Sequence, residues 1–282
     1  MSTIHILGSE GFIGRAIQRE ARAIGQDLYC WSHSQSDSKY YFNLLDSSSW
    51  VELLKHKPTT VVFLSWPGLP NYHEMFHLTR NLPASIELVE NLINAGMERL
   101  VVAGTCYEYG LQNGSLKASQ RTDPINSYAI AKDSLRRAVA NLCDSASVTW
   151  SWLRIFYPYG VGQNPNSLLP SLQRALEERR PIFPMSSGRQ IRDFVPIEIL
   201  ARQILLLSLH PLASGIYNGG SGDGRSLREI VESRIHELGG EIKLDFGFYP
   251  DRADEPLAFW ADMSEMMALE QNQSLFNDIR SD

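Results

Sequence analysis

The chain opens with an apolar strand that runs directly into a glycine-rich turn, and this junction constrains its fold more than any other segment. Residues 3–7 are mostly apolar, and Gly8, Gly11 and Gly14 follow them. Apolar residues then recur at helical spacing over 12–21, which predicts a strand, a tight turn and a helix. Gly8 permits the turn, Gly11 lets the backbone approach a pyrophosphate, and Gly14 lets the helix pack on the strand. The spacing Gly-x-x-Gly-x-x-Gly differs from the general dinucleotide fingerprint, and a glycine triad alone is equally compatible with an ordinary turn.

Apolar strands and amphipathic helices alternate along the first half of the chain. We expect strands at 27–31, 60–65, 99–104 and 148–155, and helices at 48–56, 83–95 and 127–142. Gly96 directly follows one of these helices, a position at which glycine commonly ends a helix. Such alternation predicts an α/β protein with a doubly wound parallel sheet that is covered by helices on both faces.

The composition is that of an ordinary globular protein and disfavours several classes of function. No apolar stretch approaches the roughly 20 residues of a membrane span, and no secretory leader precedes the first strand. Cys30, Cys106 and Cys143 lack metal-ligand spacing, so we expect a cytoplasmic protein with no metal site and no membrane association. The net charge of -6 disfavours nucleic acid as a partner but allows a small anionic ligand.

Tyr128 and Lys132 stand four residues apart within a predicted helix. Residues at this spacing share a helix face, so the Lys132 ammonium can lie beside the Tyr128 phenol and favour its ionised form. Such a pair alone is more often part of a solvated helix face. Here it follows Gly-Thr-Cys-Tyr-Glu-Tyr-Gly, in which Thr105 stands four residues before Tyr109. The threonine, tyrosine and lysine together predict acid–base chemistry.

The glycine turn and these three residues occur in an order that resembles the extended short-chain dehydrogenase/reductase family, specifically its nucleotide-sugar epimerases, dehydratases and reductases. The resemblance extends through about Asp262. It implies a Rossmann-type fold, a homodimer, and a catalytic triad of Thr105, Tyr128 and Lys132. In this triad the threonine hydroxyl and the phenol hydrogen-bond one carbonyl oxygen, and the phenol passes a proton to that oxygen. The lysine keeps the tyrosine acidic and bonds the nicotinamide ribose.

The same resemblance implies a dinucleotide-binding domain and a small C-terminal substrate-binding lobe. We expect the domain over 1–156 with a returning segment around 193–218, the lobe over 157–192 and 219–270, and a frayed tail over 271–282. Within the lobe, a turn-rich loop at 160–166 precedes a helix expected at 168–178. A second loop is expected at 181–192.

Residues that match the family's dinucleotide contacts are spread from the glycine turn to the helix that carries Tyr128. They are Gly8, Gly11, Phe12, Ile13, Gly14, Ser32, His33, Asn43, Leu44, Leu64, Ser65, Trp66, Asn81, Tyr128 and Lys132. Ser32 occupies the place where NAD-preferring members carry an acid for the ribose hydroxyl. NADP is therefore favoured, with Ser32, His33 and Arg15 near its 2′-phosphate, although Glu10 is an unfavourable neighbour and NAD remains the alternative. His33 is equally consistent with a solvated loop, and Trp66 with core packing.

Two arginines mark the expected substrate site. Arg192 lies in a segment similar to the family's Arg-Asp-Phe/Tyr motif, and Arg252 in a segment similar to its carboxy-terminal arginine motif. The resemblance assigns both to the diphosphate of a nucleotide sugar, which guanidinium groups match in geometry. The other expected substrate contacts are Tyr107, Asn166, Ser167, Leu168 and Phe183. Phe183 is expected against the base. Each arginine alone is equally consistent with an ordinary surface residue.

Departures from the family pattern narrow the reaction. The dehydratases place Asp-Glu after the catalytic threonine, whereas Cys106 and Tyr107 stand here, which disfavours dehydration. We expect Cys106 to be a buried small residue rather than an acid or base. Tyr157 replaces the asparagine that is usual in its segment, so the usual phosphate or sugar contact is not expected there.

Two enzymatic functions and one non-catalytic function fit these residues. A 4-ketoreductase would transfer a hydride from NADPH and a proton from Tyr128 to a nucleotide-linked 4-keto-6-deoxysugar, in deoxysugar or polysaccharide biosynthesis. A 4-epimerase would use tightly bound NAD for transient oxidation. The compact length, the absent ribose acid and the segment 65–72 favour the reductase. The third function is a sensor that only binds dinucleotide, and the intact Thr105, Tyr128 and Lys132 argue against it.

Overall fold

A parallel sheet forms the centre of the protein, in a computed structural model that describes residues 3–34, 40–252 and 255–279. Within these residues it has seven strands in the order β11-β7-β5-β4-β1-β2-β3. The strands are β1 Ile4–Leu7, β2 Leu28–Ser32, β3 Tyr40–Tyr41, β4 Thr60–Phe63, β5 Arg99–Thr105, β7 Thr149–Ile155 and β11 Gly215–Gly219. The chain begins in the middle of the sheet and winds outward in both directions. This order confirms the doubly wound Rossmann-type fold expected from the sequence.

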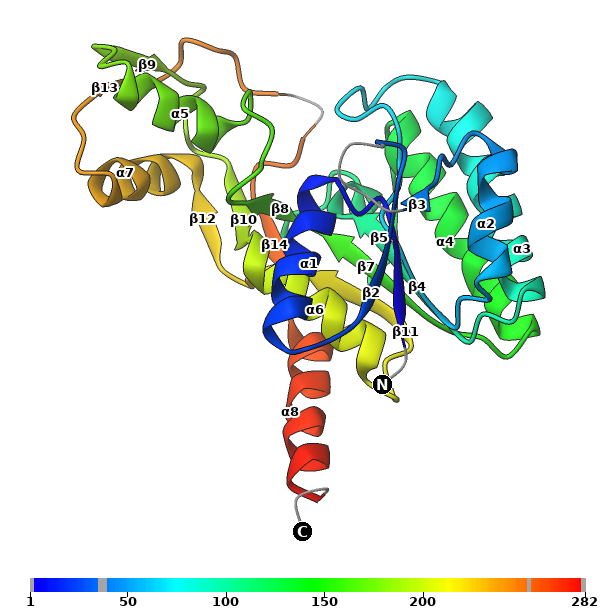
Figure 1. Cartoon of the computed structure of the whole chain (residues 1–282). Helices are drawn as coiled ribbons and strands as arrows, with labels where there is room; N and C mark the ends of the chain where they lie inside the picture. Colours follow the sequence, from blue (N-terminus) through cyan, green and yellow to red (C-terminus); the bar gives the residue numbers. More distant parts are fainter. Residues whose placement is uncertain (1–2, 35–39, 253–254, 280–282) are drawn as a thin grey trace.

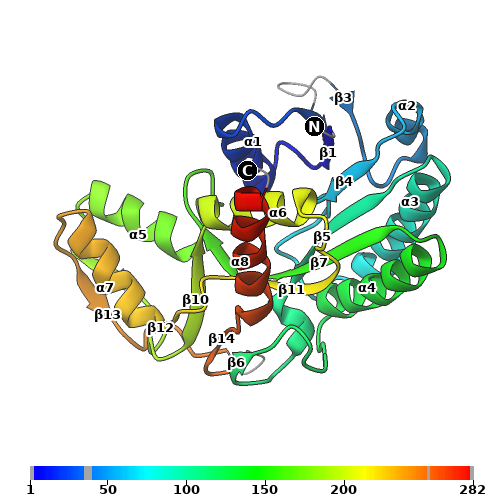
Figure 2. The ribbon, with the colours of Figure 1, turned by 90° about the horizontal axis from the view of Figure 1, so that it is seen from below.

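Helices cover both faces of this sheet because its strands present apolar side chains to both sides. The helices are α1 Phe12–Ala23, α2 Trp50–Lys55, α3 Leu82–Asn94, α4 Ser127–Ser145 and α6 Ile197–Leu209. Val61 of β4 belongs to the core beneath α2, α3 and α4, whereas its neighbour Val62 belongs to the core beneath α1 and α6. Figures 1 and 2 show α3 beside α4, and α1 beside α6. Gly96, which follows α3, has the positive φ of 96° expected at a helix end.

A smaller lobe lies to one side of the sheet (Figure 1). Its elements are α5 Leu168–Glu177, β9 Ile182–Pro184, α7 Leu227–Glu237 and β13 Lys243–Asp245, and they enclose a core of their own. A three-stranded sheet of β8 Tyr157–Tyr159, β10 Ile191–Pro196 and β12 Gly224–Ser226 stands between this lobe and the main sheet. Strand β9 corrects the expectation of a loop throughout 181–192. Its partner β13 is distant in sequence, so local sequence patterns do not reveal the pairing.

The remaining elements are short turns and strands and one longer helix. They are the helical turns η1 Ser47–Ser49, η2 His77–Asn81 and η3 Cys106–Tyr109, the paired strands β6 Gly114–Leu116 and β14 Phe259–Ala261, and helix α8 Ser264–Ile279. Helix α8 projects from the body in Figure 1. Its first turns pack, through Met266 and Leu269, on the core that lies beneath α1 and α6. The expected frayed tail is therefore helical as far as Ile279, and residues 280–282 lie outside the described part. No helix in the described part is long and apolar enough to cross a membrane.

Candidate active site

The glycine turn joins β1 to α1 with the close packing that the sequence predicts. Gly8 has a φ of 96°, and a Cβ there would lie 3.0 Å from the backbone nitrogen of Ser65. A Cβ on Gly14 would lie 2.5 Å from the carbonyl oxygens of Gly8 and Ser9, so only glycine lets the helix approach this closely. Gly11 caps α1 without a side-chain hydrogen bond. The first turn of α1 thus leaves backbone N–H groups for an anion.

The structure brings Thr105, Tyr128 and Lys132 to one cavity of about 920 Å³. Thr105 is the last residue of β5, and the other two lie on the first two turns of α4. Asn126 caps this helix by accepting the Ala129 N–H at 2.9 Å, which fixes where its first turn begins. The exposed fractions of the three residues are 6%, 7% and 3%. Their polar atoms therefore face a largely enclosed space, where electrostatic interactions are strong.

Burial controls the ionisation of both α4 residues. It raises the pKa of Tyr128, as does nearby Tyr72, while a hydrogen bond with Thr105 opposes the increase. Burial lowers the pKa of Lys132 to about 7, against the attraction of Glu108. The Lys132 ammonium donates to the Ala103 carbonyl at 2.8 Å and lies 4.0 Å from the centroid of the Trp66 ring. The expected lowering of the Tyr128 pKa is therefore not the net result, because desolvation is the larger effect, and the part that Lys132 plays in ionising the phenol stays a prediction.

Glu108 organises the turn that follows Thr105 and was missed among the expected site residues. Its Oε1 atom accepts the Thr105 N–H at 2.9 Å, and the Thr105 hydroxyl accepts the Tyr107 N–H at 3.3 Å. These two bonds form a capping box around η3. Threonine followed three residues later by glutamate is the sequence signature of a capping box, so a signal for Glu108 was present.

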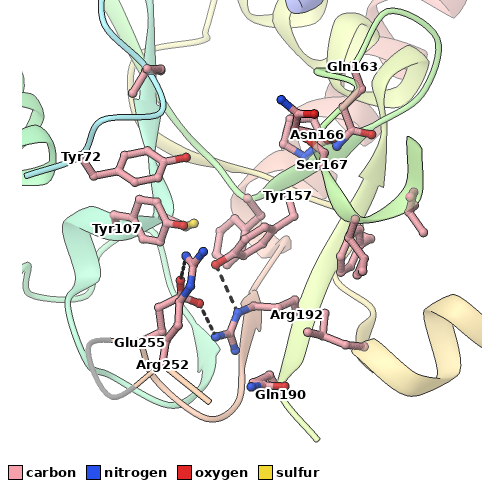
Figure 3. A pocket seen from close by; sticks show the side chains of 18 of the residues that line it. Tyr72, Tyr107, Tyr157, Gln163, Asn166, Ser167, Gln190, Arg192, Arg252 and Glu255 are labelled. Carbon is pink, nitrogen blue, oxygen red and sulfur yellow. Dashed lines mark hydrogen bonds and ion pairs between the residues drawn. The ribbon is translucent and has the colours of Figure 1, made fainter. Parts of the chain in front are cut away.

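Tyr72, Tyr107 and Tyr157 are among the residues that line the cavity (Figure 3). The ring centroids of Tyr72 and Tyr107 are 5.2 Å apart, and those of Tyr107 and Tyr157 are 6.4 Å apart with the rings perpendicular. Tyr107 was expected at the substrate, whereas Tyr72 and Tyr157 were not. Tyr72 comes from a loop far from the triad in sequence, and its carbonyl accepts the Tyr128 N–H at 2.9 Å. No sequence pattern marks that contact.

Glu255 joins the two arginines expected at the diphosphate (Figure 3). Its carboxylate accepts from Arg192 at 2.9 Å and from Arg252 at 2.8 Å. Arg192 is only 2% exposed, and it also donates to the Tyr157 hydroxyl at 3.2 Å and to the carbonyls of Ile191 and Leu257. The side chain of Arg252 is 70% exposed. Protein acceptors already engage Arg192, whereas most of the Arg252 side chain is exposed, and the assignment of both arginines to the diphosphate stays a prediction.

The other expected substrate residues line the same cavity. Asn166, Ser167 and Leu168 stand at the N-terminus of α5, where Ser167 caps the helix without a side-chain hydrogen bond. Phe183 of β9 belongs to the lobe core and also lines the cavity. The cavity thus runs from the triad to a helix N-terminus that can receive negative charge.

The expected dinucleotide contacts fall into two groups. Ile13, Leu64 and Trp66 line the cavity with Tyr128 and Lys132. Trp66 also belongs to the core, and its indole donates to His77 at 3.0 Å, which confirms core packing, while its contact with a dinucleotide stays a prediction. The cavity lining does not include Gly8, Gly11, Phe12, Gly14, Ser32, His33, Asn43, Leu44, Ser65 or Asn81.

The expected dinucleotide contacts that lie outside the cavity lining differ in whether their polar atoms are exposed or already hydrogen-bonded. Ser32 is buried, and its hydroxyl accepts the Ser34 N–H at 3.1 Å, whereas His33 is exposed. Arg15 lies 3.3 Å from the Glu10 carboxylate and donates to the Glu10 carbonyl.

Further along the chain, Leu44 is buried in the core, and Asn43 accepts the Leu45 N–H through its side chain. Asn81 donates to the Pro67 carbonyl at 2.9 Å, and its side-chain oxygen has no hydrogen-bond partner among the described residues. Asn81 is fully buried, and the part of the structure that fits a dinucleotide is the glycine turn with the free N–H groups of the first turn of α1.

Cys106 behaves as the sequence predicts. It is 4% exposed, and burial raises the pKa of its thiol far above the ordinary value. A thiol in this environment stays protonated and packs as a small apolar group.

The fold and the site define a Rossmann-type protein that binds a dinucleotide and holds a threonine, a tyrosine and a lysine in one cavity. The model of the NAD dependent epimerase/dehydratase family matches residues 4–220, and the chain belongs to this family.

Individual relatives show the same resemblance. The chain is 30% identical over 273 residues to dTDP-6-deoxy-L-talose 4-dehydrogenase (NAD(+)) of Aggregatibacter actinomycetemcomitans, covering 91% of this chain and 98% of the relative. It is 24% identical over 268 residues to dTDP-4-dehydro-6-deoxyglucose reductase of Escherichia coli, covering 86% and 83%. The solved UDP-glucose 4-epimerase of Thermus thermophilus in complex with NAD has the same fold, with a TM-score of 0.79, 20% identity, and 94% and 92% coverage.

Proposed function

We propose that this protein is an NAD(P)H-dependent oxidoreductase that reduces the 4-keto group of a nucleotide-linked 4-keto-6-deoxysugar. The observation that carries the proposal is the shared cavity. Thr105, Tyr128 and Lys132 line it from β5 and α4, and Arg252 and the N-terminus of α5 line it as well. Two relatives carry names for 4-position dehydrogenation or reduction of dTDP-linked deoxysugars. A nucleotide sugar needs both groups of lining residues at once, since its sugar reacts at one group while its diphosphate is held by the other.

The residues have distinct roles in this reaction. The dinucleotide, when bound, supplies the hydride that adds to the carbonyl carbon. Tyr128 donates a proton to the carbonyl oxygen, and the Thr105 hydroxyl hydrogen-bonds the same oxygen. The raised pKa of Tyr128 keeps its phenol protonated before the reaction, as a proton donor requires. Lys132 provides positive charge beside the phenolate that the proton transfer leaves behind.

NADPH is the proposed cofactor, because no carboxylate occupies the position of Ser32 at the end of β2. A neutral side chain there avoids repulsion of a 2′-phosphate. The name of one relative specifies NAD(+), so NADH is the alternative. We further propose a cytoplasmic homodimer, for which light scattering of the purified protein should give twice the chain mass.

A 4-epimerase remains the second candidate, because a solved protein of the same fold carries that name and both reactions need the same triad. Cofactor retention separates the two. An epimerase must return the hydride to its substrate and therefore holds NAD through purification, whereas a reductase exchanges its cofactor each cycle.

The test combines mass spectrometry of the cofactor released from purified protein with NADPH oxidation on a panel of 4-keto sugar nucleotides. We expect little retained cofactor and one NADPH consumed for each sugar nucleotide reduced. Retained NAD together with C4 epimerisation and no net NADPH consumption would establish the epimerase instead. Dinucleotide binding without turnover of any sugar nucleotide would favour the non-catalytic sensor.

A further inference from the structure

Glu108 is a fully buried carboxylate directly behind the reacting groups. Its exposed fraction is 0%. Besides the Thr105 N–H, it accepts the Trp152 indole N–H at 2.9 Å and the Arg154 Nε–H at 2.8 Å. Arg136 of α4 lies at 3.9 Å. A charge removed from water in this way costs several kcal/mol unless it is paired and hydrogen-bonded, and here it is both.

The pairing anchors the turn after β5 to the neighbouring strand. Arg154 lies on β7, is 1% exposed, and also donates to the Ala118 carbonyl at 2.9 Å. Gly104 makes the approach possible, since a Cβ there would lie 2.2 Å from the Trp152 nitrogen and 2.8 Å from Glu108 Oε1. Thr105 is therefore held through its N–H by the Glu108 carboxylate, which Trp152 and Arg154 in turn hold in place.

Lys132 and Glu108 are bonded to the same end of β5, Lys132 through the Ala103 carbonyl and Glu108 through the Thr105 N–H. The contacts of Lys132 are the Ala103 carbonyl of β5 and the Trp66 ring after β4. His77 of η2 faces it, and its own pKa is lowered, chiefly by burial and further by Lys132. Tyr128 stands one turn away on α4. The charge that supports the ammonium against desolvation comes from Glu108.

We propose that Glu108 is a positioning residue of the catalytic centre, which fixes Thr105 at the end of β5 and supplies the buried negative charge that acts on the Lys132 ammonium. Arg154 and Arg136 offset that charge, and Glu108 lies outside the cavity lining. The kinetic part of this proposal rests on the proposed reductase function. The electrostatic part does not, because it concerns Lys132 alone.

The decisive experiment titrates Lys132 by NMR in protein carrying ¹³C-labelled lysine, with Lys132→Arg used to assign the signal. Wild type should titrate near the pKa of about 7 that burial gives. Glu108→Gln keeps an oxygen for the Thr105 N–H but removes the charge, so the Lys132 pKa should fall by about one unit or more. Asp133→Asn is the matched control. It removes a carboxylate next to Lys132 in sequence, which instead pairs with Arg136 and Arg137.

An unchanged Lys132 pKa in Glu108→Gln, or an equal fall in Asp133→Asn, would overturn the electrostatic role whatever the enzyme's substrate is. If Glu108→Gln does not fold, the double variant Glu108→Gln/Arg154→Met removes the buried pair together and is titrated in its place. Because the positive charge of Arg154 is lost as well, the expected fall in the Lys132 pKa is smaller than in Glu108→Gln, and a pKa at or above the wild-type value would contradict the proposal.

Kinetics then test the positioning of Thr105. The kcat for keto-sugar reduction should fall as the pH rises through the Lys132 pKa, which gives the pH profile of kcat a descending limb. Glu108→Gln should move this limb to lower pH. Glu108→Ala, which also loses the Thr105 contact, should have a lower kcat than Glu108→Gln at every pH, with similar KM. A purely structural role for Glu108 would leave the limb in place and make the Gln and Ala variants differ only in stability.

Discussion

The Glu255 carboxylate accepts a hydrogen bond from Arg192 at 2.9 Å while Arg192 is 2% exposed, so the two residues form a largely buried ion pair at the lobe end of the cavity. Arg192 also lies over the Phe259 ring, 4.8 Å from its centroid. Arg252 meets the same carboxylate from the solvent side. The two arginines therefore have different tasks. Arg192 supports the cavity wall, and Arg252 can turn toward a ligand.

Replacing Arg252 and Arg192 separately should distinguish these tasks. Arg252→Ala should weaken binding of the nucleoside diphosphate by about 1.5–3 kcal/mol, the range for charge-assisted hydrogen bonds, with little change in the free energy of unfolding. Arg192→Ala should lower the free energy of unfolding by about 3 kcal/mol in addition to any loss of diphosphate binding, because it leaves Glu255 without its buried partner. Calorimetry with UDP, dTDP, CDP and GDP, together with urea unfolding, measures both quantities.

Arg189→Ala is the control for these variants, since Arg189 is exposed and pairs with Asp251 outside the cavity lining. It should bind and unfold like wild type. Normal diphosphate binding by Arg252→Ala would remove the proposed role of Arg252. Failure of all four nucleotides to bind wild type would remove the nucleotide-sugar assignment as a whole.

Tyr128→Phe should lower kcat by ~10² or more while dinucleotide affinity stays close to that of wild type, because the proton donor is lost and the ring packing remains. Steady-state rates and fluorescence titration of NADPH provide the two measurements. Tyr217 lies on the outer strand β11, and its hydroxyl donates to the Ser214 carbonyl, so Tyr217→Phe should keep normal kcat. Near-normal turnover in Tyr128→Phe would contradict the mechanism.

Ser32→Asp should reverse the cofactor preference. Wild type should bind NADPH more tightly than NADH, and a carboxylate at this buried strand end should repel the 2′-phosphate and accept a ribose hydroxyl instead. Ser32→Asn has a similar size without the charge and should keep the preference for NADPH. A several-fold preference of wild type for NADH would show that the cofactor assignment is wrong and would strengthen the epimerase alternative.

The stability of the protein should depend on pH through His5. Burial, and next the nearby His56, lower the pKa of His5 from 6.5 to about 4, and the Trp31 indole donates to its Nδ1 at 3.2 Å. The unfolded chain then binds a proton between these two pH values while the folded chain does not. The free energy of unfolding should therefore fall as the pH is lowered from 6.5 toward 4.

Urea unfolding of His5→Gln measures this contribution, because glutamine keeps an acceptor for Trp31 but does not titrate. The difference in unfolding free energy between the variant and wild type should shift in favour of the variant as the pH falls from 7.5 to 4.5. A constant difference for His5→Gln across this range would rule out the contribution.

The sequence by itself determined the elements that follow from local chemistry. Residues 3–21 predict the strand, turn and helix because the glycines and the apolar periodicity act within a few residues. The alternation of strands and helices likewise predicts the parallel doubly wound sheet. Thr105, Tyr128 and Lys132 were identifiable because their spacing and order match a family pattern, and the structure places them in one cavity. Their catalytic roles remain predictions.

Tertiary structure decided what depends on burial and on partners distant in sequence. The Lys132–Tyr128 spacing predicted a lowered tyrosine pKa, yet the fold encloses both groups and desolvation reverses the sign. The family resemblance assigned Arg192 to a diphosphate. In the structure, β10 places this side chain among Tyr157, Glu255 and backbone carbonyls. The pairing of β9 with β13 is likewise set between distant segments. Neither desolvation nor long-range pairing is encoded within a short window of sequence, because both arise only when separate segments exclude water together.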